Sequence, residues 1–118
     1  MTIKIKNLTP HPVTINGITY SPEGIIPRIS EIREEPIRMT GLTLERIFVG
    51  DIQGLPDPDG SFLIVSREVA QKAHRPDVVC PCDYIRDADG HIIGAKSVAW
   101  FPPSDISPDE LLKEENVN

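Results

Sequence analysis

The sequence has few aromatic residues, no long apolar run and very few histidines. Aromatic side chains make up 5% of the 118 positions, so any core must rely on Ile, Val and Leu. No apolar stretch approaches the roughly 18 residues of a membrane-spanning helix, and no signal peptide precedes the first predicted strand. We therefore expect no contact with a membrane and a location in a reducing cytoplasm.

Cysteine is nearly absent, which bears on disulfides and metal binding. The two cysteines, Cys80 and Cys82, are separated only by Pro81, and cysteines this close rarely reach disulfide geometry. Structural zinc sites space paired cysteines by two to four residues and need a second pair, which His74 and His91 do not supply in a recognised pattern. The sequence predicts no disulfide, no metal site and no cofactor.

The side chains that an enzyme needs are also missing as a group. Nucleophilic catalysis requires a hydroxyl or thiol beside a base that a third group orients. Ser66 precedes a predicted helix, where it is expected to act as a cap, and no G-x-S-x-G motif surrounds it. With three histidines and no paired H-x-T motif, the chain is predicted to bind a ligand and not to be an enzyme.

Basic surface is lacking as well. The formal charge is −6, of which −4 falls in residues 104–118. An acidic chain without a basic stripe is repelled by phosphate backbones, so nucleic-acid binding is not expected.

What is present is a series of short strand and turn signals, helped by twelve prolines and eight glycines. Polar and apolar residues alternate over residues 2–6, and Asn16-Gly17 between two short apolar runs is typical of a β-hairpin over residues 13–20. Residues 25–32 and 42–49 are predicted as further strands, and Pro36 marks an edge or a loop.

A buried strand and a short helix follow. Residues 62–65 form a continuous apolar run, which indicates a strand that is buried on both faces. Ser66 is a suitable N-cap for the next helix, and Pro76 forbids its continuation. The turn at 87–90 opens a hairpin into a last strand at 91–100.

The C-terminal segment has its own signal. Residues 107–110 read as a capping box with proline at the first helical position, so a short acidic helix is predicted there. The fold class is therefore α+β, mainly antiparallel β in a small barrel- or sandwich-like sheet. We expect one ligand-binding domain over residues 1–103 and an acidic C-terminal helix or tail over residues 104–118.

Three arginines stand at predicted element boundaries: Arg28, Arg75 and Arg86. A guanidinium is always charged and offers a planar fork of donors that matches phosphate oxygens, so a fixed arginine suits an anionic ligand. The alternative is pairing with a neighbouring acid: Arg28 with Glu31, Arg75 with Asp77, and Arg86 with Asp87 or Asp89. The sequence also leaves two roles open for the aromatic residues. They could stack on a base or belong to the core: Phe62, Tyr84 and Trp100.

Several short motifs occur in a distinctive order: Asn7-Leu-Thr-Pro-His11, Pro22-x-Gly-x-x-x-Arg28, Gly54-Leu-Pro-x-Pro58, Phe62-Leu-Ile-Val-Ser66, Arg75-Pro-Asp77 and Ile85-Arg-Asp-x-x-Gly-x-Ile-Ile-Gly94. In this order the chain resembles the Thoeris anti-defence sponge family of phages. The resemblance covers most of the chain except its C-terminal tail.

The resemblance implies a non-enzymatic protein that sequesters a cyclic nucleotide immune signal. Ligands in this family are glycocyclic ADP-ribose and, in some members, cyclic oligonucleotides, and by withholding these signals the family counters Thoeris and CBASS immunity. The family implies a homo-oligomer, a dimer or hexamer, with pockets at subunit interfaces. By position the resemblance implies these ligand-binding residues: Arg28, Phe62, His74, Arg75, Arg86 and Asp87. Among them, Arg28 and Arg86 are the expected phosphate contacts, and His74 falls where the family has an asparagine.

Two other functions remain open from the sequence. An acidic phage inhibitor that binds a host defence protein, in the manner of an anti-CRISPR, would suit the acidic tail. A virion accessory protein would suit the small β-rich domain.

Overall fold

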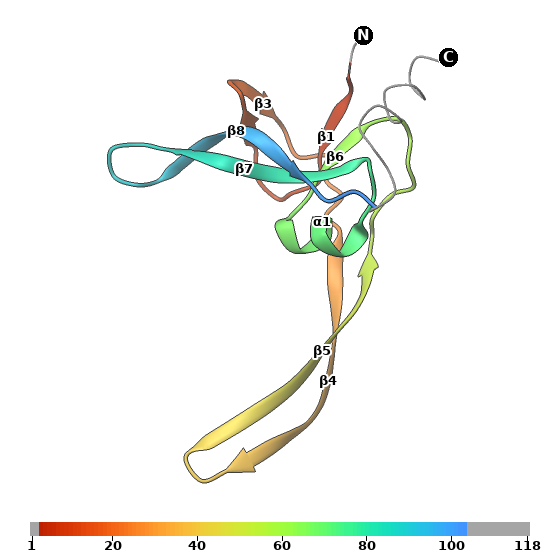
Figure 1. The fold of residues 1–118 in the computed structure, drawn as a ribbon, viewed down its shortest axis with the longest axis vertical. Coiled ribbons are helices and arrows are strands. Elements are labelled where there is room, and N and C mark those ends of the chain that lie inside the picture. The colour runs from red at the N-terminus through yellow and green to blue at the C-terminus, as the bar shows by residue number, and fades with distance from the viewer. Residues whose placement is uncertain (1–2, 104–118) are drawn as a thin grey trace.

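The computed structural model describes residues 3–103, which form a β-rich body with one long projecting hairpin (Figure 1). The body contains six strands: β1 (Ile5–Asn7), β2 (Val13–Ile15), β3 (Ile18–Tyr20), β6 (Phe62–Ile64), β7 (Val78–Arg86) and β8 (Ile92–Trp100). The hairpin, called the arm below, consists of β4 (Arg28–Met39) and β5 (Leu42–Gln53). One helix is found among residues 3–103, α1 (Arg67–Ala73), and it follows β6. The predicted C-terminal helix lies outside the described residues.

The six-stranded sheet curls until its two ends nearly meet. Its order is β1-β6-β7-β8-β2-β3, and the ends join through a bridge between Asn7 and Pro22. The backbone N–H of Glu23 donates to the carbonyl of Asn7 at 2.9 Å beside this bridge. The predicted β-rich domain with one short helix is confirmed, and its sheet is barrel-like.

The sheet is mixed, which the sequence did not predict. β7 pairs antiparallel with β8, and β2 pairs antiparallel with β3, but the pairings β1–β6, β6–β7 and β2–β8 are all parallel. A helix between two neighbouring strands returns the chain in the original direction, and α1 does so between β6 and β7. Long ladders such as β7–β8 nevertheless keep most paired residues antiparallel.

Local turn and cap signals are confirmed. Asn16 and Gly17 have φ values of 51° and 83°, as a type I′ turn between β2 and β3 requires. Ser66 accepts the backbone N–H of Val69 at 3.4 Å and caps α1. The helix ends before Pro76 with His74 in the left-handed region. Within residues 3–103, no helix is long and apolar enough to cross a membrane.

The core lies between the sheet and α1. Leu63 of β6 is 2% exposed and faces the helix, because side chains alternate along a strand. Its two neighbours in β6 therefore face the inside of the curled sheet. The helix side of the core comprises Leu8, Leu63, Val65, Val69, Ala70, Val78 and Cys80.

The side chain of Asn7 is completely buried in the body and holds the N-terminal loop. The Nδ2 group of Asn7 donates to the carbonyls of His11 at 2.8 Å and Tyr20 at 2.9 Å. Its Oδ1 accepts from the backbone N–H of Thr9 at 2.9 Å and from the Thr9 hydroxyl at 2.7 Å. Since all donor and acceptor positions are occupied, this buried amide joins β1, its following loop and β3.

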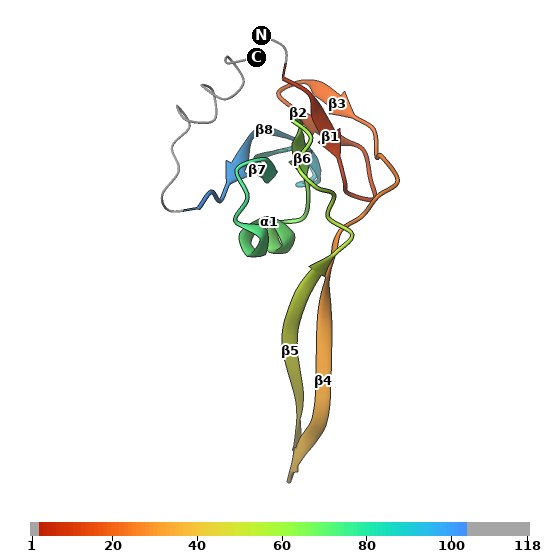
Figure 2. The ribbon, with the colours of Figure 1, turned by 90° about the vertical axis from the view of Figure 1, so that its right-hand side faces the viewer.

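The arm extends well beyond the strands predicted at 25–32 and 42–49. β4 and β5 each run for 12 residues and meet at a turn containing Gly41. Pro36 lies inside β4, at an irregularity between Glu34 and Ile37 where the register shifts. Proline is tolerated at such a bulge because no ladder hydrogen bond is needed from its nitrogen. The base of the arm packs on the body through Ile29 and Ile52, and the rest projects away from it (Figure 2).

An exposed ion pair gives the body a measurable pH dependence. Lys6 donates to Asp59 at 2.5 Å, and this hydrogen bond, together with one from the backbone N–H of Ser61, holds the pKa of Asp59 well below its usual value. The carboxylate therefore stabilises the fold above about pH 4, and this contribution is lost as the pH falls through the folded pKa. The same contact raises the pKa of Lys6, so its contribution is lost only as the pH rises through that value.

We expect Asp59→Asn to be less stable than the wild type at neutral pH, with the difference shrinking as the pH falls below about 4. Urea unfolding at several pH values measures this difference. A difference that grew under acid conditions would contradict the assignment.

Candidate functional site

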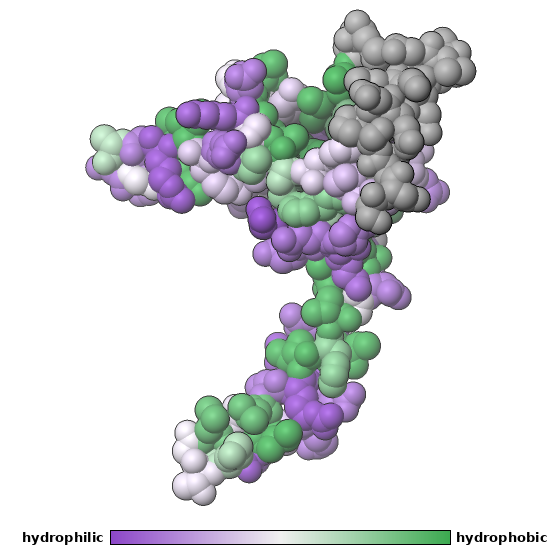
Figure 3. Space-filling view, in the orientation of Figure 1, coloured by the Kyte–Doolittle hydropathy of each residue, from purple (hydrophilic) through white to green (hydrophobic). Residues whose placement is uncertain are grey.

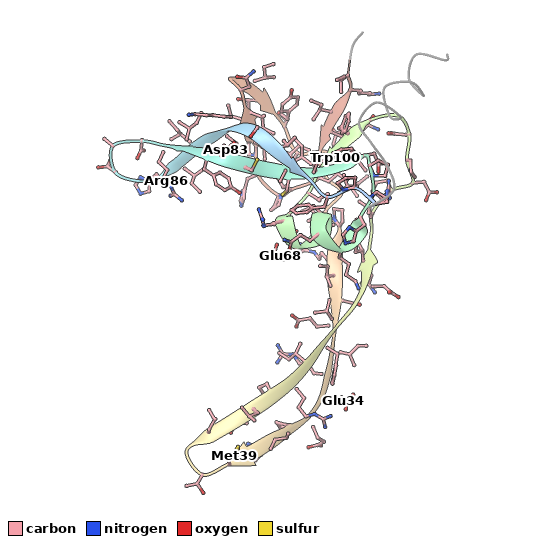
Figure 4. The ribbon with its side chains drawn as sticks, in the orientation of Figure 1. Glu34, Met39, Glu68, Asp83, Arg86 and Trp100 are labelled. Carbon is pink, nitrogen blue, oxygen red and sulfur yellow. The ribbon has the colours of Figure 1, made fainter. Side chains whose placement is uncertain are left out.

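The six residues predicted to bind a ligand do not converge within one chain. Arg28 begins β4 at the base of the arm, whereas Arg86 lies at the far end of the β7–β8 hairpin (Figure 4). The arm and that hairpin project from the body in different directions (Figure 1). No side-chain hydrogen bond or ion pair among residues 3–103 joins any two of the six.

Arg75 follows the alternative interpretation, pairing with a neighbouring acid. Its Nη2 and Nε donate to the carboxylate of Asp77 at 2.6 and 2.9 Å, in a bidentate arrangement. Its Nη1 donates to the carbonyl of Pro56 at 2.8 Å, and its side chain is 23% exposed. The contacts with Asp77 hold the guanidinium in the corner after α1, and the contact with Pro56 joins this corner to the connection after β5. This guanidinium therefore has a structural role.

Arg86 and Asp87 lie side by side but do not neutralise each other. Arg86 donates from Nη1 to the carbonyl of Gly90 at 2.8 Å. The carboxylate of Asp87 instead accepts the backbone N–H groups of Asp89 at 2.9 Å and His91 at 3.0 Å, which stabilises the turn. In the described part of the chain Arg86 forms no ion pair, so its charge remains available to an anion.

Arg28 is also without an acidic partner among residues 3–103. It is exposed at the first position of β4, opposite Gln53 of β5. The predicted alternative, an ion pair with Glu31, is not formed. The carboxylate of Glu31 instead lies 3.7 Å from the guanidinium of Arg33. The structure thus distinguishes two free arginines from one that is committed to the fold.

A shallow groove lies beside Tyr84, two residues before Arg86. Tyr84 is 51% exposed, and the pairing of β7 with β8 shifts register between Ile85 and Arg86, next to it. The groove has a volume of about 190 Å³, below the roughly 300 Å³ at which pockets begin to enclose small ligands. Its lining residues are Pro12, Val13, Thr14, Pro81, Tyr84, Ile92, Ile93, Gly94 and Ala95.

The backbone next to this groove is unusual. Asp83 has φ 54° in the middle of β7, a left-handed conformation that is uncommon outside glycine but more accessible to aspartate. The Ser97 hydroxyl donates to its carboxylate at 2.9 Å, and Cys82 Sγ lies 3.2 Å from the same hydroxyl. Sequence reasoning missed this strained residue, since nothing in a strand pattern signals it except the residue type.

His74 is placed by the end of α1. Its φ of 47° and ψ of 42° make it the left-handed cap residue, and its backbone N–H donates to the carbonyl of Ala70. Asparagine is the common alternative to glycine at such a cap, so a histidine here satisfies a local backbone requirement. Its side chain makes no hydrogen bond or ion pair in residues 3–103.

Phe62 lies in an apolar setting on the inner side of the sheet. The hollow it lines has a volume of about 230 Å³ and no polar surface; its other lining residues are Ile3, Ile5, Ile15, Ile64, Val79 and Val98. A nucleotide needs polar partners for its phosphates and base edges, which this hollow does not offer. Trp100 is also structural, because its Nε1 donates to the carbonyl of Pro76 at 2.8 Å. Tyr84 is thus the exposed aromatic residue closest in sequence to a free arginine.

Among residues 3–103, the groups that could hold a metal are not assembled into a protein-lined cage. Burial raises the pKa of the Cys80 thiol, which keeps it protonated and a poor ligand. Asp87, Asp89 and His91 have ligand atoms within 4.8 Å of one another, but all three are exposed on a turn. Asp87 is already used by that turn.

A third depression separates the base of the arm from α1. Its volume is about 480 Å³, and it is lined by Ile29, Glu31, Val49, Glu68, Gln71 and Lys72. The two carboxylates there make it a poor site for an anion.

No known protein family, characterised protein or solved structure matched the chain at a significant level.

Proposed function

We propose that the chain is a phage anti-defence sponge, which binds a cyclic nucleotide immune signal and leaves it chemically unchanged. The observation that carries the proposal is a pair of exposed arginines, Arg28 and Arg86, without acidic partners among residues 3–103. A free guanidinium at the end of a strand is suited to a phosphate, because its donors are held in place before binding. The order of motifs that resembles the sponge family supports the same function.

The chemistry of the β7–β8 hairpin supports a nucleotide over a simple anion. Tyr84 offers an exposed ring for a base, two residues before Arg86 in β7. Stacking on an aromatic ring contributes about 1–3 kcal/mol per base and does not depend on base identity. Phosphate contacts from the guanidinium would add charge-assisted hydrogen bonds.

The size of the groove implies that a second copy completes the site. A volume of about 190 Å³ is too small to enclose a dinucleotide, and in one copy Arg28 begins β4 whereas Arg86 ends β7, which projects in another direction (Figure 1). A homo-oligomer, a dimer or hexamer, would place Arg28 of one copy against Arg86 of another. In this arrangement the protein acts in the host cytoplasm by mass action alone, and tenfold tighter capture requires about 1.4 kcal/mol.

A release experiment tests the proposed function. The purified protein is incubated with glycocyclic ADP-ribose or a cyclic oligonucleotide, freed of unbound ligand and denatured by heat. We expect the ligand to be recovered intact from the supernatant. Cleaved ligand would identify an enzyme, and an empty supernatant for every nucleotide tried would reject the sponge.

Two substitutions locate the site. Arg28→Ala and Arg86→Ala are each expected to weaken capture roughly 10- to 100-fold, since each removes charge-assisted hydrogen bonds to a phosphate. Arg33→Ala is the matched control, because Arg33 is an exposed arginine whose guanidinium lies 3.7 Å from Glu31. Isothermal titration calorimetry measures the three affinities. Equal affinities for all three variants would place the ligand elsewhere.

A second candidate function is inhibition of a host protein by direct binding. The exposed apolar side chains of the arm favour it, because contiguous apolar surface commonly marks a protein contact. Co-purification with one host protein, without any bound nucleotide, would favour this function over the sponge.

A further inference from the structure

The arm has one apolar face, which the strand register defines. Residues directly opposite each other in an antiparallel pair point to the same side. Four successive pairs fall on one side of the arm: Ile32–Phe48, Glu34–Arg46, Ile37–Leu44 and Met39–Leu42. The apolar face therefore consists of six large apolar side chains and one ion pair.

The bulge at Pro36 makes this face continuous. Strict alternation would place Ile32 and Ile37 on opposite sides of β4, because they are five residues apart. The register shift between Glu34 and Ile37 adds one residue to β4. As a result the apolar residues on both sides of the bulge point the same way.

This face is exposed to solvent in the single chain. The exposed fractions of its apolar side chains range from 42% for Leu44 to 58% for Met39, and the exposed fraction of Ile32 is 56%. Figure 3 shows hydrophobic surface along the projecting arm. A lone two-stranded hairpin is at best marginally stable in water, so a partner that covers this face would stabilise the arm.

We propose that the apolar face packs against the same face of a second copy, with the two arms parallel and related by a two-fold axis that runs along them. The charges on the face are the reason for choosing a second copy. Glu34 and Arg46 lie 3.6 Å apart and interrupt the apolar residues near the middle of the face. Rotation about an axis along the arm exchanges the β4 and β5 sides and brings Glu34 of each arm to Arg46 of the other, so the face is complementary to itself.

The parallel arrangement also matches the apolar residues. Met39 of each arm then lies against Leu42 of the other, and Ile32 lies against Phe48. Apolar surface covers apolar surface along the whole overlap, and no charge is buried without an opposite charge.

The other face of the arm is unsuited to such a contact. It carries the exposed charged residues Glu31, Arg33, Arg38 and Glu45 around Ile47 and Val49. Burying these charges against a second copy would cost more desolvation free energy than burial of the two apolar side chains would contribute. The proposal therefore selects one face of the arm.

The size of the contact sets its strength. From Ile32 to Met39 the apolar face spans roughly 25 Å, and the two strands make it roughly 10 Å wide. That is roughly 250 Å² per copy, about a third of a standard interface. We expect a dimer whose population depends on concentration, unless further surfaces join it.

Charge reversal tests the proposal by sedimentation velocity over a concentration series. Glu34→Arg makes the face uniformly positive and Arg46→Glu makes it uniformly negative, so each variant alone should be shifted towards monomer. An equimolar mixture should associate again, at least 10-fold more tightly than either variant alone. The ion pair within each chain stays broken in the mixture, so recovery reports contact between arms.

A matched pair of neighbours provides the control. Phe48 and Ile47 are adjacent in β5, are 47% and 43% exposed, and lie on opposite faces. Phe48→Ser should weaken the dimer and Ile47→Ser should leave it unchanged, with circular dichroism confirming that both variants fold.

Three results would overturn the proposal. They are a wild-type monomer at about 1 mM, a dimer insensitive to both charge reversals, or a mixture that fails to associate. No nucleotide enters these measurements, so failure of the sponge and failure of the arm contact can be told apart. A monomer that instead binds a host protein through the arm would support inhibition.

Discussion

Replacing Asn7 with alanine should lower the free energy of unfolding by about 3 kcal/mol. The side chain of Asn7 is fully buried and makes four hydrogen bonds, to Thr9, His11 and Tyr20. Alanine would leave two carbonyls and one backbone N–H without their partner in a setting with little water. The loop after β1 would then lose its attachment to β3.

Urea unfolding of the variant measures this loss. Gln53→Ala is a suitable control, because Gln53 is an exposed amide at the end of β5 and its removal should change stability by less than about 0.5 kcal/mol. Equal stability of Asn7→Ala and the wild type would mean that water replaces the amide without cost.

The second large effect is expected at Leu63. This side chain is 2% exposed and packs in the helix side of the core with Val69 and Ala70. Leu63→Ala removes buried apolar atoms and leaves a cavity, which together should cost about 3 kcal/mol. Thermal unfolding followed by circular dichroism measures the change.

Val98→Ala provides the comparison on the other side of the sheet. Val98 is 37% exposed and lines the open apolar hollow. Truncation to alanine therefore removes little buried apolar surface. We expect a loss below about 1 kcal/mol. If Val98→Ala proved as damaging as Leu63→Ala, the hollow would have to be closed in solution.

The elements that the sequence predicted well depend on local chemistry. Asn16 and Gly17 adopt positive φ because their own backbones tolerate it, and Ser66 caps α1 because its hydroxyl reaches an N–H three residues away. Neither feature requires knowledge of distant parts of the chain.

The candidate site was less accessible for a related reason. The sequence offered each arginine an acid nearby, but only the folded chain shows that Arg75 takes its acid while Arg86 donates to a carbonyl. Whether a guanidinium is free depends on which groups the fold brings within about 3 Å of it, and spacing along the chain does not reveal this. The placement of Phe62 in an apolar hollow was hidden for the same reason.

By itself the sequence determined the turns, the helix cap, a small β-rich domain and an acidic net charge without a basic stripe. These follow from φ preferences, side-chain capping and composition, which act over a few residues. Only the tertiary structure decided the parallel pairings, the length of the arm and the bulge that aligns Ile32 with Ile37. Strand order and register depend on contacts between segments far apart in the chain, and a shift of one residue moves a side chain to the other face.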